Sequence, residues 1–330
     1  MFIKCSRPLI STVQFSCKRY ASRLRIQVPP PFPVIKTCPS PTCECRPMPT
    51  GLDIDREQDL NGTMAAYGEH VLISTGKDDW KSRIEDEEIG PGELAREMKK
   101  LLGRGGPHSD PYHNVMITNS SFPLSEPFEP ADTTVASAFL FPSFRYVPCI
   151  PLQGESIRNF VKGFVLPTEL HPSYDAVSEE QRAPLLRQQS LQDEFEPMSV
   201  NQIVVLICGH GGRDLRCGVM GPLLHDEFEE KLKQQDIQVA YDESSMEDYQ
   251  AISARVGLIS HIGGHKYAGN VIIYIPPSYN DHPLAGKGIW YGRVSPEHVE
   301  GIVRTTIIEG KVIKEFFRGG INNDGSILRL

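Results

Sequence analysis

The stretch QIVVLICGHGGRDLRCG (residues 202–218) decides the fold of the C-terminal half of this chain. Its first part is a nearly continuous apolar run that ends at Cys208, as in a buried strand of an α/β sheet. Three glycines follow between Cys208 and Cys217, and glycine lets a short loop fold back with little steric hindrance. Since α/β folds bind ligands beyond the carboxyl ends of their strands, we expect Cys208 to border such a crevice.

The rest of this half continues the alternation of strands and helices. The sequence predicts an amphipathic helix at 221–235 and a second helix at 295–310, with Ser295 as N-cap and Pro296 at the first helical position. Apolar runs predict strands at the following ranges: 237–242, 254–264, 269–277 and 288–294.

The N-terminal half shows the same order of elements. Strands are expected at 70–76, 114–122 and 136–152, with helices at 91–106 and 154–165. Each half therefore forms a βαβ-ββα unit of roughly 100 to 130 residues. This order predicts an α/β protein of two thioredoxin-like domains with mixed sheets.

Composition divides the chain into five expected segments. Residues 1–43 carry seven Lys and Arg residues and no Asp or Glu, which is typical of a mitochondrial transit sequence or, alternatively, of a disordered basic tail. We therefore expect the protein in the mitochondrion, in the matrix. The segments are a presequence (1–36), a Pro- and Cys-rich leader (37–66), an N-terminal domain (67–168), an acidic linker (169–199) and a C-terminal domain (200–330).

Charge and hydropathy exclude two classes of protein. The formal net charge of -8 argues against general nucleic-acid binding. No run of 18 apolar residues is present, so no membrane span is expected. Six cysteines follow the presequence, and in a reducing compartment cysteines are more often metal ligands or redox groups than structural disulfides.

Two cysteines and two histidines stand out as a ligand set. Cys208 and Cys217 are followed by His261 and His265 in SHIGGHKYAGN (residues 260–270), where the glycines argue against a helix. Two thiolates and two imidazoles bind zinc tetrahedrally or a [2Fe–2S] cluster. The Rieske pattern is absent, because no histidine stands two residues after Cys217. A third alternative is buried thiols and satisfied histidines without metal.

The segments CGHGGRDLRCG, HIGGHKYAGN and GIWYGRV together resemble the sucrase/ferredoxin-like family. That resemblance implies a thioredoxin-like ferredoxin in residues 200–330, with a non-Rieske [2Fe–2S] cluster. It also implies the cluster ligands: Cys208 and Cys217 on one iron and His261 and His265 on the other. The family's cytosolic members tend to end in an aromatic residue, which this chain lacks. Maturation by the mitochondrial iron–sulfur assembly machinery is therefore expected.

An electron carrier is a better interpretation than a substrate-converting enzyme, since no acid–base or nucleophile set accompanies the ligands. Its redox donor and acceptor are unknown. With neutral histidines the oxidised cluster carries no net charge, so its potential is expected above the value of about −400 mV of plant-type clusters. Two alternatives stay open: a thiol–disulfide oxidoreductase acting on mitochondrial protein thiols, and a zinc-stabilised binding protein.

Several other residues have two interpretations each. Cys38, Cys43 and Cys45 could bind metal, exchange disulfides or belong only to a mobile leader, whereas Cys149 is expected to be a packed thiol. His210 is a second-layer donor, an alternative ligand or a loop histidine. Trp290 and Tyr291 are expected to be core residues or to shield the cluster from water. The basic residues near the ligands either stabilise the cluster or lie on a solvated loop; they are Arg213, Arg216 and Lys266.

Overall fold

The C-terminal half is built around two buried strands. The structure, a computed structural model, describes residues 29–87, 90–125, 134–241 and 252–330. β7 (Ile203–Cys208) and β10 (Val271–Ile275) pair antiparallel, and every residue of both is buried, as their apolar sequences predict. β7 also pairs parallel with β9 (Ser253–Ile259). The other strands are β8 (Gln238–Val239) beside β9, and β11 (Lys287–Tyr291), β13 (Phe317–Asn322) and β14 (Ile327–Leu328) in order beyond β10.

The N-terminal half repeats this pairing. β2 (Glu69–Ser74) runs parallel to β3 (Val115–Ser120) and antiparallel to β4 (Val135–Phe141), which pairs antiparallel with β5 (Arg145–Pro151). In the C-terminal half, β7 likewise runs parallel to β9 and antiparallel to β10, and β10 pairs antiparallel with β11. β6 (Met198–Ser199) pairs with β5 at the far edge. The repeated order of elements expected from the sequence thus extends to the strand pairing.

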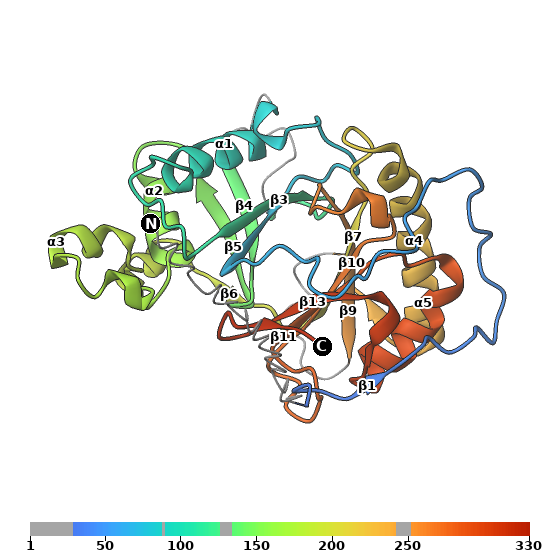
Figure 1. Ribbon diagram of the computed structural model, residues 1–330. Helices are drawn as coiled ribbons and strands as arrows, with labels where there is room; N and C mark the ends of the chain where they lie inside the picture. The colour runs from blue at the N-terminus through green and yellow to red at the C-terminus, as the bar shows by residue number, and fades with distance from the viewer. Residues whose placement is uncertain (1–28, 88–89, 126–133, 242–251) are drawn as a thin grey trace, which may run out of the picture.

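The two halves share one sheet (Figure 1). β3 and β9 pair antiparallel at Ser120 and Ile259, and the sheet runs in the order β14-β13-β11-β10-β7-β9-β3-β2-β4-β5-β6. The mixed α/β prediction is confirmed, but the sheet is continuous where two sheets were expected. The physical reason is that an edge strand presents unpaired backbone groups, which a second edge strand satisfies.

A buried aromatic cluster also joins the halves. The Tyr67 hydroxyl lies 2.7 Å from the Tyr274 hydroxyl, and the Trp290 Nε1–H donates to the Tyr67 hydroxyl at 3.1 Å. Phe141 stacks on Tyr274 with ring centroids 4.0 Å apart. Side chains from both predicted domains therefore form one core, and the domain limits at 67–168 and 200–330 stay a prediction.

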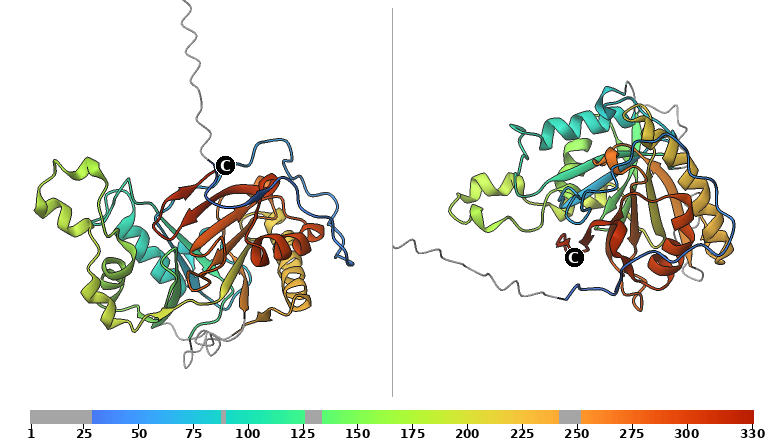
Figure 2. Two further views of the ribbon diagram at one scale, coloured as in Figure 1. Left: turned by 90° about the horizontal axis from the view of Figure 1, so that it is seen from below. Right: turned by 45° about the vertical axis from the view of Figure 1, so that its right-hand side comes forward.

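In each half, the helices pack beside the strands of the same half (Figures 1 and 2). α1 (Pro91–Leu102) packs on β2, β3 and β4 and contacts α2 (Ser156–Phe160), whose last turn widens through 161–165. α4 (Leu215–Gln234) packs on β7 and β9 and contacts α5 (Pro296–Ile302), which widens through 303–308. Ser295 caps α5, as predicted. In the part of the chain that the structure describes, no helix has both the length and the apolar character needed to cross a bilayer.

The predicted linker, residues 169–199, consists of short helical turns. It includes α3 (Glu179–Arg182) and 3₁₀ turns at 172–174, 183–185 and 189–194, and it ends in β6. In Figures 1 and 2 the part around α3 projects from the N-terminal half. Among the described residues, three further 3₁₀ turns lie elsewhere, at 84–86, 265–267 and 314–316.

The end of the predicted presequence (1–36) and the predicted leader (37–66) both pack on the folded protein. β1 (Val34–Ile35) pairs parallel with β12 (Val312–Ile313), and the buried Phe32 lies against Phe317 with ring centroids 6.0 Å apart. The chain then follows α5 and α4 (Figure 1), where Arg46 pairs with acidic side chains of α4. Ordered packing therefore begins well before residue 67. Residues 1–28 of the predicted presequence lie outside the described part of the chain.

Candidate metal centre

Cys208 and Cys217 meet where the end of β7 approaches the start of α4. Cys208 is the last residue of β7, Cys217 lies in the first turn of α4, and both side chains are buried. The sequence predicts the helix only from residue 221, but α4 begins at Leu215. The reason is that the Asp214 side chain caps the helix by accepting from the Arg216 backbone N–H at 3.0 Å.

Glycines allow this close approach. A Cβ added at Gly218 would lie 2.6 Å from the Cα of Gly211, and one added at Gly221 would lie 2.4 Å from the Cα of Gly209. No side chain fits at such distances, so only glycine permits the strand end and the helix to touch. The glycines that the sequence offers as loop residues therefore act as the contact between two elements.

The two thiols interact with each other and with a histidine. The S–H of Cys217 hydrogen-bonds to Cys208, and together with the His261 ring it lowers the pKa of Cys208 well below that of an ordinary thiol. The same contact and burial raise the pKa of Cys217, because a second thiolate beside the first is opposed by like charge. The pair therefore holds one negative charge readily and resists a second one unless a cation neutralises it.

The two histidines project from a glycine turn after β9. Gly263 and Gly264 have φ values of 82° and 73°, a region that side chains rarely adopt, and a short 3₁₀ turn begins at His265. The rings of His261 and His265 face one another with centroids 5.4 Å apart. The expectation that this segment is not an α-helix agrees with the structure.

His265 carries an unsatisfied buried nitrogen. Its Nδ1 is buried and has no hydrogen-bond partner among the described residues, although 43% of the side chain is exposed. The Nε2 lies 3.9 Å from an oxygen of Asp214. A buried ring nitrogen without a partner costs free energy, and a bound metal ion is one way to satisfy it.

The donor set suits a centre with a sulfur pair and a nitrogen pair. Thiolate and imidazole are ligands of zinc and of iron–sulfur clusters. The structure brings the thiols of Cys208 and Cys217 together with His261, and it places His265 beside His261. Within the described ranges, no three His, Cys, Asp or Glu side chains lie close enough together to hold a single metal ion.

The basic residues near these ligands have partners. Arg216 makes a bidentate pair with Asp214, with both N–O distances 2.9 Å, and this lowers the pKa of Asp214 to about 2. Lys266 pairs with Asp55 at 3.3 Å, and the Arg213 guanidinium donates to the Ser82 carbonyl at 3.4 Å. Each of these three charges therefore has its own partner near the site. Arg213 and His261 also line a surface groove of about 390 Å³.

His210 holds the backbone around the site. Its Nδ1 accepts from the His261 N–H at 3.0 Å, and its Nε2 lies 3.1 Å from the Trp80 carbonyl oxygen and 3.0 Å from that of Lys81. Both ring nitrogens therefore contact backbone groups. Of the two predicted shielding residues, Trp290 belongs to the aromatic core and Tyr291 bonds to Thr306 at 2.8 Å.

The other cysteines lie apart from this site. Cys43 donates to Glu300 at 3.0 Å, Cys45 lies 3.6 Å from the Cys43 carbonyl, and Cys38 lies 3.5 Å from the His298 carbonyl. Burial raises the pKa of Cys38 to about 12, which disfavours a thiolate. Cys149 is half-buried in β5.

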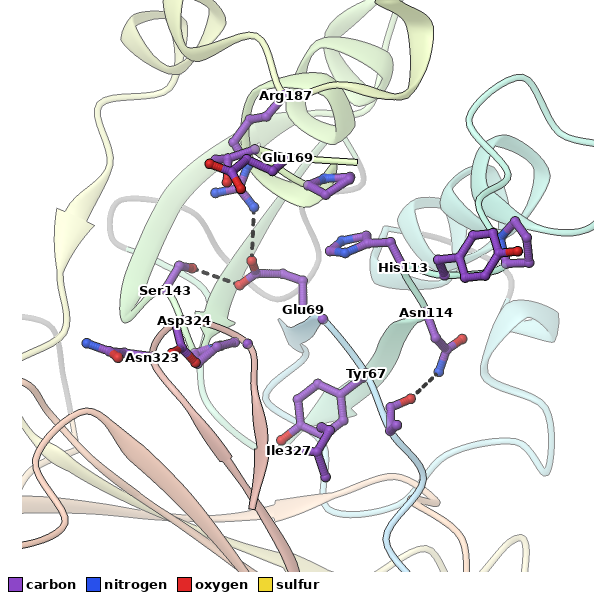
Figure 3. A pocket seen from close by; sticks show the side chains of 18 residues that line it. Tyr67, Glu69, His113, Asn114, Ser143, Glu169, Arg187, Asn323, Asp324 and Ile327 are labelled. Atoms are coloured by element: carbon purple, nitrogen blue, oxygen red, sulfur yellow. Dashed lines mark hydrogen bonds and ion pairs between the residues drawn. The ribbon is translucent and has the colours of Figure 1, made fainter. Parts of the chain in front are cut away.

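A second cavity, of about 650 Å³, opens around Glu69 (Figure 3). The Glu69 carboxylate accepts from Ser143 at 2.8 Å and from Arg187 at 3.2 Å, and burial raises the pKa of this carboxyl. These bonds satisfy both of its oxygens. The four predicted ligands do not line this cavity, so its chemistry is separate from theirs.

Two residues at the site were missed in the sequence. Asp214 has a recognisable signal, since an Asp just before a helical pattern is a typical N-cap. Arg318, in β13, hydrogen-bonds to the Gly263 carbonyl between the two histidines. It has no local signal, because it stands more than fifty residues from any ligand and reaches the site only through the sheet.

Comparison with known proteins identifies one family and several similar proteins. The profile of the family described as sucrase/ferredoxin-like matches residues 60–319. The chain is 32% identical over 299 residues to altered inheritance of mitochondria protein 32 of Meyerozyma guilliermondii, covering 87% of this chain and 95% of the relative. The protein of the same name from Debaryomyces hansenii is 32% identical over 317 residues, covering 92% and 98%. The predicted family resemblance is confirmed.

A shorter match has a different name. The chain is 39% identical over 104 residues to actin patches distal protein 1 of Saccharomyces cerevisiae, which covers 32% of this chain and 29% of that protein. No solved structure matches the chain significantly.

Proposed function

This chain belongs to the sucrase/ferredoxin-like family, and on that premise we propose that it is a mitochondrial electron-transfer protein with a [2Fe–2S] cluster. In this proposal Cys208 and Cys217 bind one iron, and His261 and His265 bind the other. When bound, such a cluster accepts and releases single electrons. The proposed role is an electron carrier between a donor and an acceptor that are still unknown.

One observation carries the proposal. Two buried thiols in mutual contact lie beside a histidine pair, and the second histidine has a buried Nδ1 without a partner among the described residues. The thiols resist carrying two negative charges on their own, so a cationic centre between them would relieve the repulsion. An unpartnered imidazole nitrogen would gain its missing bond in the same way.

The ligand types set the expected potential. Two thiolates and two neutral imidazoles hold an oxidised [2Fe–2S] core at zero net charge, whereas four thiolates would hold it at −2. Adding an electron to a neutral site costs less than adding one to a dianion. Histidine ligation should therefore place the potential above about −400 mV, in or near the Rieske range of about −150 to +300 mV.

We extend the proposal to fold and location. Each half pairs its strands as a βαβ-ββα unit, which supports two thioredoxin-like units joined edge to edge. The basic, acid-free N-terminal segment and the mitochondrial inheritance named in the relatives support import into the mitochondrion. Cluster insertion would then be the task of the mitochondrial iron–sulfur assembly machinery.

Electron paramagnetic resonance of the reduced protein tests the ligand set. We expect His261→Cys and His265→Cys each to change the g-values, because thiolate would replace imidazole on one iron. His225→Cys is the control, since His225 lies on α4 beside Asp226 and takes no part in the site. Unchanged g-values in both site variants would remove histidine ligation from the proposal.

The contact between Cys208 and Cys217 also favours a second function, thiol–disulfide exchange. In this reaction the two thiols would form a disulfide and give two electrons and two protons to a protein disulfide, which becomes two thiols. The lowered pKa of Cys208 supplies the thiolate that such an exchange needs. Zinc on the same donors is the remaining metal alternative.

Visible absorption and metal analysis separate the three functions. A cluster absorbs between 400 and 600 nm, whereas zinc and a disulfide are silent there. We expect about two irons per chain in the purified protein, and both Cys208→Ser and Cys217→Ser should lose them. Cys149→Ser is the matched control. Colourless protein with stoichiometric zinc, or with a reducible disulfide, would exclude the cluster.

A further inference from the structure

Arg318 is a buried cation whose hydrogen-bonding partners are all uncharged. Its side chain is 1% exposed, and its guanidinium donates to the Thr63 hydroxyl at 3.1 Å and carbonyl at 3.0 Å. It also donates to the Gly263 carbonyl at 3.2 Å and to the Asn270 side-chain oxygen at 2.6 Å. Among the described residues, none of these hydrogen bonds goes to a carboxylate.

Such a charge is costly unless a negative group compensates it. Burial lowers the pKa of Arg318 to about 10, so the side chain remains protonated at neutral pH. The rings of Tyr267 and Trp290 contribute part of the compensation, with centroids 5.5 and 5.7 Å from the guanidinium carbon. Negative charge on Tyr267, Cys208 or Cys217 opposes this lowering of the Arg318 pKa.

Arg318 is also tied to both ligand segments. It bonds to Gly263, between the two histidines, and a Cβ at Gly264 would lie 2.6 Å from its Nη2. Asn270 connects Arg318 to the cysteine strand. Its side-chain amide donates to the Gly264 carbonyl at 3.0 Å, and its backbone carbonyl accepts from the Cys208 N–H at 3.0 Å. One guanidinium therefore contacts the histidine loop directly and the cysteine strand through one residue.

We propose that Arg318 is the fixed counter-charge of the metal centre, which stabilises its reduced and more negative state. This inference rests on the proposed function. One electron from an external one-electron donor lowers the net charge of the centre by one, and no bond in the protein is made or broken. A buried positive charge nearby favours that state and raises the potential.

The test compares midpoint potentials of the reconstituted protein. For two charges roughly 10 Å apart at an effective dielectric constant of about 20, Coulomb's law favours the reduced state by on the order of tenfold. We therefore expect Arg318→Gln to lower the reduction equilibrium constant about tenfold, or about 59 mV for one electron. Arg318→Lys keeps the charge and should stay near wild type, although both variants lose hydrogen bonds and stability.

A matched control is Arg293→Gln. Arg293 packs on the same Tyr267 ring at 5.2 Å, but it already pairs with Asp55 at 3.3 Å. Its loss should leave the potential unchanged. If Arg318→Gln does not fold, Arg318→Met removes the same charge and keeps an unbranched side chain in the buried position, so it should lower the potential by a similar amount.

The outcomes are distinct. A lower potential in Arg318→Gln or Arg318→Met, with Arg318→Lys and Arg293→Gln near wild type and g-values unchanged, supports the proposal. Equal potentials in all cluster-containing variants overturn it and leave the proposed function intact. Wild-type protein that takes up no cluster overturns both. Equal shifts in Arg318→Lys and Arg318→Gln would mean that the residue acts through structure alone, which also overturns the counter-charge.

Discussion

Alanine at Gly221 tests whether the contact between β7 and α4 assembles the site. The added methyl group would lie 2.4 Å from the Cα of Gly209 and 3.1 Å from the Cys208 carbonyl oxygen. Carbon atoms in contact are normally about 3.5 to 4.0 Å apart. Backbone atoms cannot rotate away, so the strand end and the helix must separate by about 1 Å.

The energetic cost follows from that overlap. Overpacking costs about 1–3 kcal/mol, and a clash between backbones belongs at the upper end. Replacing glycine by alanine inside a helix returns about 1 kcal/mol. We therefore expect Gly221→Ala to lower the free energy of unfolding of the metal-free protein by about 2 kcal/mol. Because Cys217 lies one turn away on the same face of α4, the thiols should also move apart and iron binding should fall.

Gly163→Ala is the matched control. A Cβ there meets its nearest neighbour, the Leu191 Cβ, at 3.4 Å, which is an ordinary contact. Its stability should be unchanged or higher by up to about 1 kcal/mol. Urea unfolding of the metal-free variants and iron per chain after reconstitution are the two measurements. Wild-type stability and wild-type iron content in Gly221→Ala would refute this reasoning.

Three further predictions concern stability. Burial lowers the pKa of His70 to about 3, below the ordinary 6.5, so the unfolded chain binds a proton at this residue before the folded protein does, and the free energy of unfolding falls as the pH drops below about 6.5. In urea unfolding, His70→Gln should therefore lose about 1.4 kcal/mol less stability than wild type between pH 7.5 and 5.5. An equal loss in both proteins would contradict this prediction. Asp214→Ala removes the cap of α4 and should cost about 1 kcal/mol, measured by thermal unfolding against Asp214→Asn, which retains a cap. Glu227→Gln removes the carboxylate that lies 3.2 Å from the buried Lys231 ammonium, and it should lower the free energy of unfolding by about 3–5 kcal/mol. Glu230→Gln changes a side chain that is 44% exposed and should lower it by under about 1 kcal/mol. Similar losses of stability in the two variants would show that the buried pair is not special.

Local patterns predicted much of this protein. The apolar runs that end at Cys208 and precede His261 correspond to β7 and β9, because a strand buried on both faces needs apolar residues throughout. Residue type and glycine spacing singled out two cysteines and two histidines as predicted ligands. In the structure Cys208 interacts with Cys217 and His261, and the ring of His261 lies beside that of His265. These features depend on neighbours within a few residues, which a sequence displays directly.

Features that depend on the assembled sheet were not predictable. The pairing of Ser120 with Ile259 joins edges about 140 residues apart, and neither strand carries a mark of its partner. Arg318 looks like an ordinary surface arginine until β13 is placed beside β11. The early start of α4 was missed for another reason: the glycines at 218 and 221 lower helix propensity, but the packing against β7 outweighs that cost.

The anchoring of Phe32 limits how far the protein can be shortened. A recombinant fragment that starts at residue 37, the predicted end of the presequence, would lack both β1 and the ring that covers Phe317. Phe317 directly precedes Arg318, so the uncovered strand is the one that supports the histidine turn. Fragments intended for spectroscopy should therefore begin upstream of Phe32, and a processing protease that left the protein competent would have to cut there as well.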